Sequence, residues 1–108
     1  MKSRWGLLAL ALLGAAPLRA QVTFERILNA EREPANWLSY SGTVTNQRYS
    51  RLDQITAANV KDLKLQWIWQ AASLEKFEAT ALVVDGVLYT VQAPNTVVAL
   101  DATTGRIF

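Results

Sequence analysis

The fold of this chain is decided by the stretch EATALVVDGVLYTVQAPNTVVALDATTGR, residues 78–106. Within it, Asp85-Gly86 stands between two β-rich runs and is a strong hairpin signal, because both positions of such a turn need positive φ. Further turns are expected at residues 93–95 and 103–105, where proline, asparagine, threonine and glycine gather. Three turns in quick succession predict an antiparallel meander.

The turns define the strands, and one carboxylate, Glu78, stands at the leading edge of the first strand. We expect strands at residues 80–84, 87–92 and 96–100, and the start of another at 106–108. A single sheet of this kind has two apolar faces, which only further layers of chain can cover. The chain alone is therefore expected to be marginally stable, with six side chains left largely in water: Val83, Val84, Leu88, Val97, Val98 and Leu100.

Three short elements are predicted ahead of the sheet. Residues 22–32 have helical spacing with Thr23 as N-cap, and we expect a short packing helix without chemistry. A single helical turn opened by Thr56 is expected over residues 56–63. Residues 63–70 then alternate apolar and polar side chains, which is typical of a half-buried strand.

A faint internal repeat links two parts of the chain. Residues 62–67 align with residues 104–108 when Lys64 is set on Arg106, an offset of 42 residues. Four-stranded propeller blades recur at roughly 40–45 residues, so the offset suits one blade per repeat. In this alignment the chain stops one residue before the counterpart of Trp67, which is how a truncated propeller is expected to look.

The first twenty residues have the layout of a secretory signal peptide, with a basic start, an apolar run and a small residue, Ala20, before the expected cleavage. The apolar run is shorter than the roughly 20 residues that cross a bilayer, so we favour a cleaved leader over a membrane anchor. Gln21 follows the cleavage point, which excludes a lipid anchor on a cysteine there.

Composition excludes several classes of function. Without the leader, eight basic residues face nine acidic ones, and no basic cluster remains that would suit nucleic acid. The chain has no cysteine and no histidine, which excludes a disulfide framework, histidine-based triads and the usual zinc sites within these residues.

Several segments agree in order and spacing with one known family. They are NW at 36–37, Y-x-G at 40–42, YSRLDQITAANVKDL at 49–63, Trp67, EATALVVDGVLY at 78–89, PNT at 94–96 and ALDATTG at 99–105. With these segments the chain resembles the amino-terminal part of the pyrroloquinoline-quinone (PQQ)-dependent alcohol and methanol dehydrogenases.

The resemblance implies an all-β fold in which this chain holds the first blade, four-stranded and antiparallel, of an eight-bladed β-propeller. The expected organisation is a signal peptide at 1–20, an N-terminal helix and extended segment at 21–62, and a ring-closing strand with an incomplete first blade at 63–108. Trp67 fits the family's tryptophan that docks neighbouring blades.

The resemblance also implies a function. Enzymes of this family work in the periplasm, hold PQQ and a calcium or lanthanide ion on the propeller axis, and oxidise alcohols. They pass electrons to a cytochrome c or to membrane quinone. Glu78 occupies the position of the family's glutamate that hydrogen-bonds the quinone, and it is the one cofactor-binding residue expected here. The family's metal ligands and catalytic aspartate lie beyond residue 108, so no catalytic or metal residue is expected in this chain.

Other interpretations stay open. Without the resemblance, a lone carboxylate before a strand such as Glu78 is more often a solvated loop residue than a functional one. Aspartates in turn contexts (Asp53, Asp85 and Asp101) are expected to cap backbone groups rather than to bind metal, and Trp37, Trp67 and Trp69 are expected to pack rather than to hold a cofactor. The whole protein is alternatively a non-enzymatic propeller scaffold, such as an outer-membrane assembly factor, or an inert remnant of a longer gene.

Overall fold

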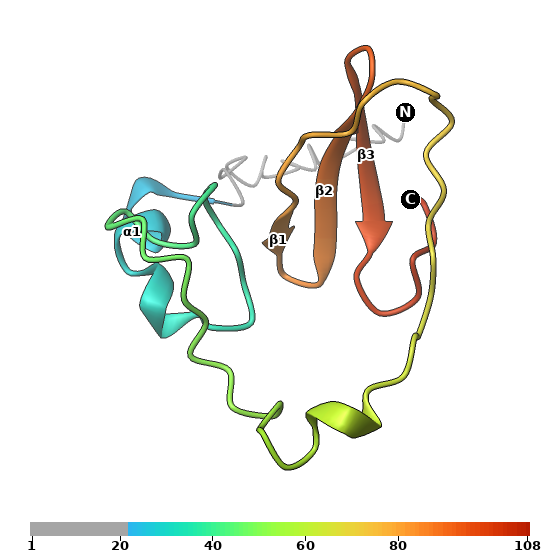
Figure 1. The fold of residues 1–108 in the computed structure, drawn as a ribbon. Coiled ribbons are helices and arrows are strands. Elements are labelled where there is room, and N and C mark those ends of the chain that lie inside the picture. The colour runs from blue at the N-terminus through green and yellow to red at the C-terminus, as the bar shows by residue number, and fades with distance from the viewer. Residues whose placement is uncertain (1–21) are drawn as a thin grey trace, which may run out of the picture.

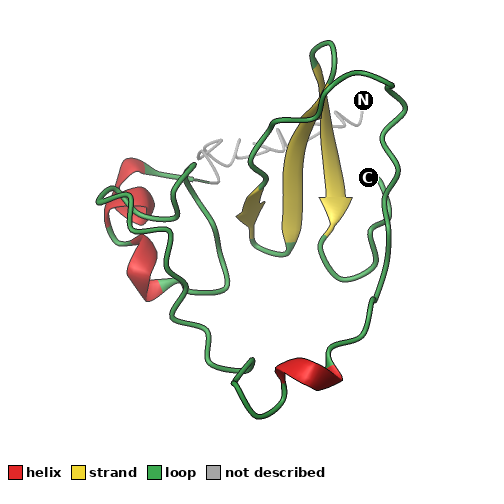
Figure 2. Ribbon diagram, viewed as in Figure 1, coloured by secondary structure: helices red, strands yellow, loops and turns green. Residues whose placement is uncertain are grey.

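The meander is present as a three-stranded antiparallel sheet of order β1-β2-β3 in the computed structural model, which describes residues 22–108 (Figure 1). The strands are β1 (Leu82–Val84), β2 (Val87–Gln92) and β3 (Thr96–Asp101). Figure 2 shows all three in the C-terminal third of the chain, with the helices confined to the earlier residues. The expected signal peptide at 1–20 lies outside the described residues.

All three predicted turns are confirmed. Asp85 and Gly86 have φ values of 49° and 82°, and Val84 pairs with Val87 across them, so a two-residue loop closes the first hairpin. The second turn joins β2 to β3 through residues 93–95. In the third, the amide of Asp101 donates to the carbonyl of Arg106 at 2.9 Å.

The fourth strand of the predicted blade is present only in outline. After the third turn the chain folds back along β3, where Ile107 forms an isolated bridge with Leu100. The amide of Phe108 donates to the carbonyl of Ala99 at 3.0 Å. The described sheet therefore has three strands and one bridging residue.

The predicted N-terminal helix is shorter than expected. It consists of α1 (Phe24–Leu28), with Thr23 Oγ1 accepting from the amide of Arg26 at 3.2 Å, and a 3-10 turn, η1 (Ala30–Arg32). Asn29 lies between them with φ −103° and ψ 22°, and its amide and its side chain both donate to the carbonyl of Glu25. Phe24, the first residue of α1 and part of the predicted packing helix, is 73% exposed.

This N-terminal block (residues 22–38) adjoins β1. The amide of Trp37 donates to the carbonyl of Val83 at 2.8 Å, and the amide of Val83 returns a bond of 3.1 Å. A small core of Ala30, Leu38 and Val84 is buried behind this bridge. The outer edge of β1 is thus covered by the chain itself.

The expectation that the apolar side chains of the sheet stay largely in water is wrong for half of them. Val84, Val98 and Leu100 are buried, and Leu100 keeps only 1% of its surface exposed. The reason is that segments before the sheet wrap both of its sides. Val97 remains mostly exposed, as expected.

The strand that the sequence predicts at residues 63–70 does not form. Within the part of the chain that the structure describes, residues 63–81 form no strand or bridge, and Leu65 and Ile68 are 76% and 77% exposed. An extended segment becomes a strand only when a neighbour completes its ladder, and here the C-terminal residues, with Ile107 bridged to Leu100, lie between β3 and the segment (Figure 1). Its role in closing a ring of blades stays a prediction.

The helical turn before this segment is confirmed as η2 (Val60–Asp62), but the side chain that bonds the local backbone is that of Asn59 and not that of Thr56. The side chain of Asn59 accepts from the amide of Thr56 at 2.7 Å, and its amide group donates to the carbonyl of Gln54 at 2.8 Å.

No helix in residues 22–108 has the length and apolarity to cross a membrane.

Candidate functional site

Glu78, the predicted cofactor residue, lies in the extended segment that leads into β1. It is exposed, and residues 79–81 separate it from Leu82, where the strand begins. Within the described residues it makes no hydrogen bond or ion pair, so its carboxylate oxygens are free to accept. The structure thus gives the position of Glu78, and within residues 22–108 no hydrogen-bond donor or cation binds its carboxylate.

The neighbours of Glu78 alternate between two sides of the chain. Phe77, Ala79 and Ala81 line a pocket of about 290 Å³, whereas Thr80 and Leu82 line a different one of about 190 Å³. Because successive side chains of an extended chain point to opposite faces, Glu78 falls on the side of Thr80 and Leu82.

The larger pocket lies between the 67–81 segment and one face of the sheet. Trp69 and Phe77 meet edge to face with ring centroids 6.0 Å apart, and Leu88, Thr90 and Leu100 supply the sheet side. The hydroxyl of Thr90 is buried there without a hydrogen-bond partner. The lining is mainly apolar and aromatic, which suits packing better than redox chemistry.

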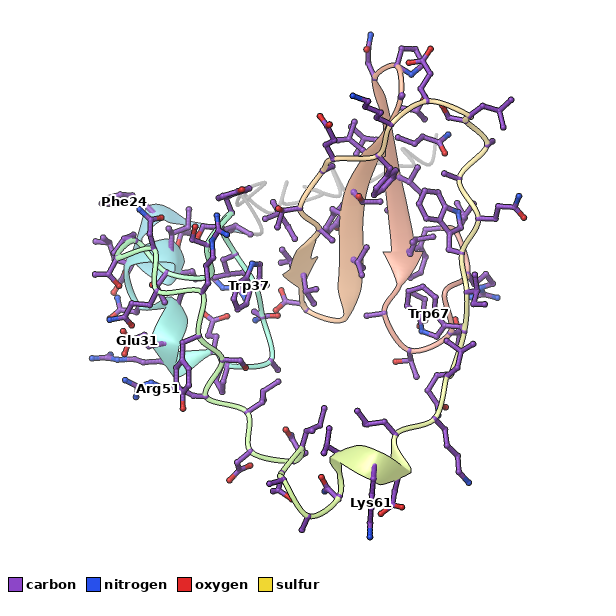
Figure 3. The ribbon with its side chains drawn as sticks, in the orientation of Figure 1. Phe24, Glu31, Trp37, Arg51, Lys61 and Trp67 are labelled. Atoms are coloured by element: carbon purple, nitrogen blue, oxygen red, sulfur yellow. The ribbon has the colours of Figure 1, made fainter. Side chains whose placement is uncertain are left out.

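The predicted packing role of two tryptophans is confirmed by glycines beneath their rings. A Cβ on Gly42 would lie 2.8 Å from the Trp37 ring, and one on Gly105 would lie 2.5 Å from the Trp67 ring. Trp67 Nε1 also donates to the carbonyl of Ala102 at 3.2 Å, 35 residues away. Figure 3 shows Trp67 reaching from the extended segment toward the third turn.

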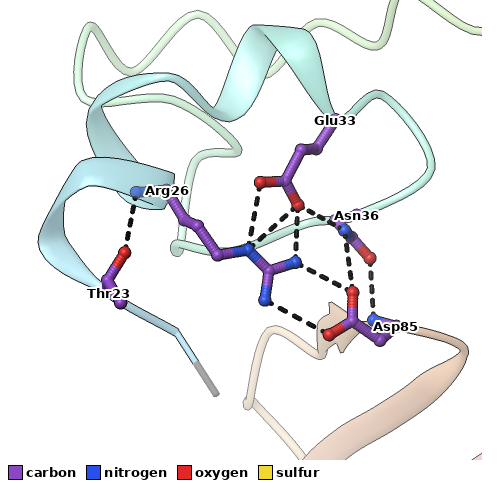
Figure 4. Close-up of polar contacts among 5 residues, drawn as sticks. All are labelled: Thr23, Arg26, Glu33, Asn36 and Asp85. Atoms are coloured by element: carbon purple, nitrogen blue, oxygen red, sulfur yellow. Dashed lines mark hydrogen bonds and ion pairs between the residues drawn. The ribbon is translucent and has the colours of Figure 1, made fainter. Parts of the chain in front are cut away.

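A polar cluster that the sequence did not reveal joins the N-terminal block to the first hairpin (Figure 4). Arg26 donates through Nε and Nη2 to Glu33, at 3.0 and 2.5 Å, and through Nη2 and Nη1 to Asp85, at 2.8 and 3.2 Å. Asn36 donates to Glu33 at 2.7 Å and accepts from the amide of Asp85 at 2.8 Å. We call these four residues the Arg26 cluster.

The electrostatics of the Arg26 cluster follow from these bonds. Hydrogen bonds to Glu33 and then to Asp85 raise the pKa of Arg26 above its ordinary value. The same bond from Arg26, followed by the one from Asn36, lowers the pKa of Glu33. No sequence pattern signals the cluster, because Arg26 and Asp85 are 59 positions apart.

The carboxylates of the turn residues Asp101 and Asp85 bind different partners. Asp101 caps the third turn as predicted, with Oδ1 accepting from the amides of Thr103 and Thr104 at 2.8 and 2.9 Å, and these bonds lower its pKa. Asp85 occupies its turn as expected, but its carboxylate also pairs with Arg26. Among residues 22–108 no three acidic, histidine or cysteine side chains gather as a metal site.

Comparison with known proteins places these features in a wider context. A family model for the β-propeller domain of glucose/ethanol/alcohol dehydrogenases, designated PQQ, matches residues 37–108. The dehydrogenase subunit of a quinone alcohol dehydrogenase from Acetobacter aceti is 46% identical over 96 residues, which cover 86% of this chain and 13% of that protein.

Two solved structures resemble the chain. The quinohemoprotein alcohol dehydrogenase ADHIIG from Pseudomonas putida HK5 aligns with a TM-score of 0.77 at 45% identity, covering 80% of this chain and 13% of the other. A europium-containing methanol dehydrogenase aligns with a TM-score of 0.68 at 34% identity, covering 78% and 15%. The chain thus spans about an eighth of the length of the relatives that it matches.

Proposed function

Because the chain belongs to the PQQ family of glucose, ethanol and alcohol dehydrogenases, we propose that it forms the first blade of an eight-bladed quinoprotein that oxidises alcohols. The observation that carries the proposal is the match over residues 37–108, which contains the whole sheet and Glu78. A three-stranded antiparallel sheet with a bridging residue beyond β3 is consistent with a blade.

Glu78 is the residue that we assign to the cofactor. Its exposed carboxylate lies just before β1 and has no partner within the described residues, so it can accept hydrogen bonds from a polar quinone. Bound PQQ would supply the two-electron oxidation, and the protein would supply position and electrostatics. Cationic groups that balance an anionic cofactor would come from other parts of the longer protein.

The metal and the electron acceptor are also assigned by proposal. A europium-containing relative supports a bound metal ion, and we assign a lanthanide or calcium ion on the propeller axis by proposal. Because residues 22–108 hold no cluster of metal-binding side chains, its ligands would come from elsewhere in the protein. We propose export to the periplasm through residues 1–20, with electrons passing to a cytochrome c or to membrane quinone.

The test is reconstitution of the full-length protein that contains these residues. It would be purified without cofactor, loaded with PQQ and either Ca²⁺ or a lanthanide, and assayed for dye-linked oxidation of primary alcohols. We expect activity with one of the two metals. Absence of PQQ binding and of activity under both conditions would contradict the proposal and favour a non-enzymatic propeller scaffold.

A further inference from the structure

The Arg26 cluster is the strongest polar link between the N-terminal block and the sheet. The guanidinium of Arg26 divides its donors between Glu33, in its own block, and Asp85, at the tip of the first hairpin (Figure 4). A planar fork can serve two carboxylates at once, whereas a lysine ammonium acts as a point charge. The link therefore depends on arginine specifically.

Backbone contacts carry this link into β1. The three residues that end the strand and open the turn are each held by the block: Val83 pairs with Trp37, Val84 is buried against Leu38, and the amide of Asp85 donates to Asn36. β1 is only three residues long, so a strand held by β2 alone would fray easily.

The segment that carries Glu78 depends on β1 for its position. Residues 74–80 are exposed, and they form no strand or bridge within the described chain. Glu78 is joined to the ordered sheet by residues 79–81, which run directly into Leu82. A shift of β1 would therefore move the carboxylate of Glu78 with it. The reverse does not hold, because residues 74–80 could move while β1 stays in place.

We propose that Arg26 is a positioning residue for Glu78. Its bonds to Glu33 and Asp85 hold the hairpin against the N-terminal block, and β1 transmits that placement to the carboxylate. The inference rests on the proposed function, since Glu78 must contact the cofactor for its position to matter.

The chain offers a matched control in Arg51. It forms an ion pair with Glu31, in the same N-terminal block, and within the described residues no hydrogen bond or ion pair joins either side chain to the sheet. Arg51→Met therefore removes an ion pair of the same block, more exposed than that of Arg26, without touching the hairpin. Figure 3 shows this pair on the opposite side of the block from β1.

The experiment measures the Kd of PQQ for the full-length protein by titration of the cofactor-free form. Glu78→Gln is expected to weaken binding by about tenfold or more, the usual effect of losing a charged acceptor. Arg26→Met should weaken it by about threefold to tenfold, the range typical of residues that act through others. Arg51→Met should leave the Kd of PQQ unchanged. The Kd of Arg26→Lys should lie between those of Arg26→Met and the parent.

The double variant decides between positioning and general damage. If Arg26 acts through Glu78, adding Arg26→Met to Glu78→Gln should cause no further loss, since the two effects share one route. An equal loss in both backgrounds, or no loss from Arg26→Met when Glu78→Gln weakens binding, would overturn the inference and leave the proposed function intact. No effect of Glu78→Gln would overturn the inference and the assignment of Glu78 to the cofactor, whereas absence of PQQ binding by the parent would contradict the proposed function as well.

A second variant guards against misfolding. Asp85→Asn keeps the bond between Arg26 and Glu33 and removes only the charge on the hairpin. It should reproduce the Arg26→Met effect on PQQ affinity in milder form, together with faster hydrogen exchange at the amide of Val83. Unchanged exchange at Val83 in both variants would show that the Arg26 cluster does not hold β1, and would contradict the inference.

Discussion

The two sides of the sheet are held in different ways. On the β1 side, the N-terminal block contributes a backbone bridge at Trp37, the Arg26 cluster and a buried core. On the β3 side, the segment 63–70 is attached chiefly by Trp67, whose indole rests on Gly105 and donates to Ala102. The first contact combines backbone bonds, partly exposed ion pairs and a small buried core, whereas the second is a single anchor beside exposed leucine and isoleucine.

The contrast indicates that the β1 side matters for stability and for the candidate site, whereas the β3 side matters less for both. The β1 side holds the strand that Glu78 precedes, so under our proposal its loss should disturb the candidate site. The β3 side leaves a pocket of about 290 Å³ and an unpaired extended segment. Its surfaces are suited to further packing and contribute little to the stability of the described residues.

The largest difference in the free energy of unfolding is expected between the substitution of Leu38, on the β1 side, and that of Leu65, on the β3 side. Leu38→Ala removes a buried side chain from the core of the β1 side and should lower the free energy of unfolding by about 2–4 kcal/mol. Leu65→Ala removes an exposed one and should change it by no more than about 0.5 kcal/mol. Urea unfolding of the chain measures both, and equal losses would show that the two sides are equally cooperative.

A second test compares the glycines beneath the two tryptophans. Both have positive φ, which costs an added side chain about 1–2 kcal/mol, and in both a Cβ would meet the indole ring. Gly42→Ala should therefore loosen the N-terminal block and speed hydrogen exchange at Val83. Gly105→Ala should free Trp67, seen as a red shift of its fluorescence, without affecting Val83.

Gly86→Ala serves as the control for these glycines. Gly86 also has positive φ, but nothing lies within 4 Å of the position of a Cβ, so its substitution reports backbone strain alone. Gly42→Ala should consequently cost more than Gly86→Ala. If the two cost the same, the contact between Trp37 and Gly42 does not contribute to the β1 side.

The part of this fold that the sequence predicts is the part governed by local chemistry. Strand β2, the turn at Asp85-Gly86 and the backbone cap at Asp101 each depend on residues adjacent in the chain. The strand expected at 63–70 is absent because its alternating pattern needs a partner strand, which the described residues do not supply. Periodicity indicates which side chains share a face but not whether that face is covered.

The candidate site shows the same limit. Glu78 was found through its place in a family pattern, and the structure adds that it is exposed and unpartnered within the described chain. The Arg26 cluster could not be predicted, because it joins residues 59 positions apart that each look like ordinary surface charges. Only folding brings them together.

A third test uses acid. Bonds from Arg26 and Asn36 lower the pKa of Glu33, and backbone amides in the third turn lower that of Asp101. A carboxyl group whose pKa is lowered by folding stabilises the fold above its unfolded pKa, and that contribution is lost as pH falls through the folded value. Stability should therefore decline below about pH 4.5 for Glu33 and below about pH 3.8 for Asp101.

Neutral variants separate the two contributions. Glu33→Gln should flatten the decline that begins near pH 4.5 and act on the β1 side, whereas Asp101→Asn should flatten the later decline and act on the third turn. Unfolding midpoints recorded between pH 3 and pH 7 measure both. An unaltered pH profile in Glu33→Gln would show that the Arg26 cluster contributes nothing to stability in solution.

The smallest effect on stability is expected at Ile68, on the open segment of the β3 side. This side chain is 77% exposed, and the segment forms no backbone ladder within the described chain, so Ile68→Lys should change the free energy of unfolding by no more than about 0.5 kcal/mol. Its effect should instead be on association, because an unpaired, apolar, extended segment can pair with another chain and a lysine there opposes such pairing. Light scattering of the chain at rising concentration should show less aggregation for Ile68→Lys than for the parent, while Lys61→Ala on the neighbouring turn should show no improvement. If Ile68→Lys lowers the unfolding midpoint substantially, the segment is packed in solution, and the contrast between the two sides of the sheet is wrong.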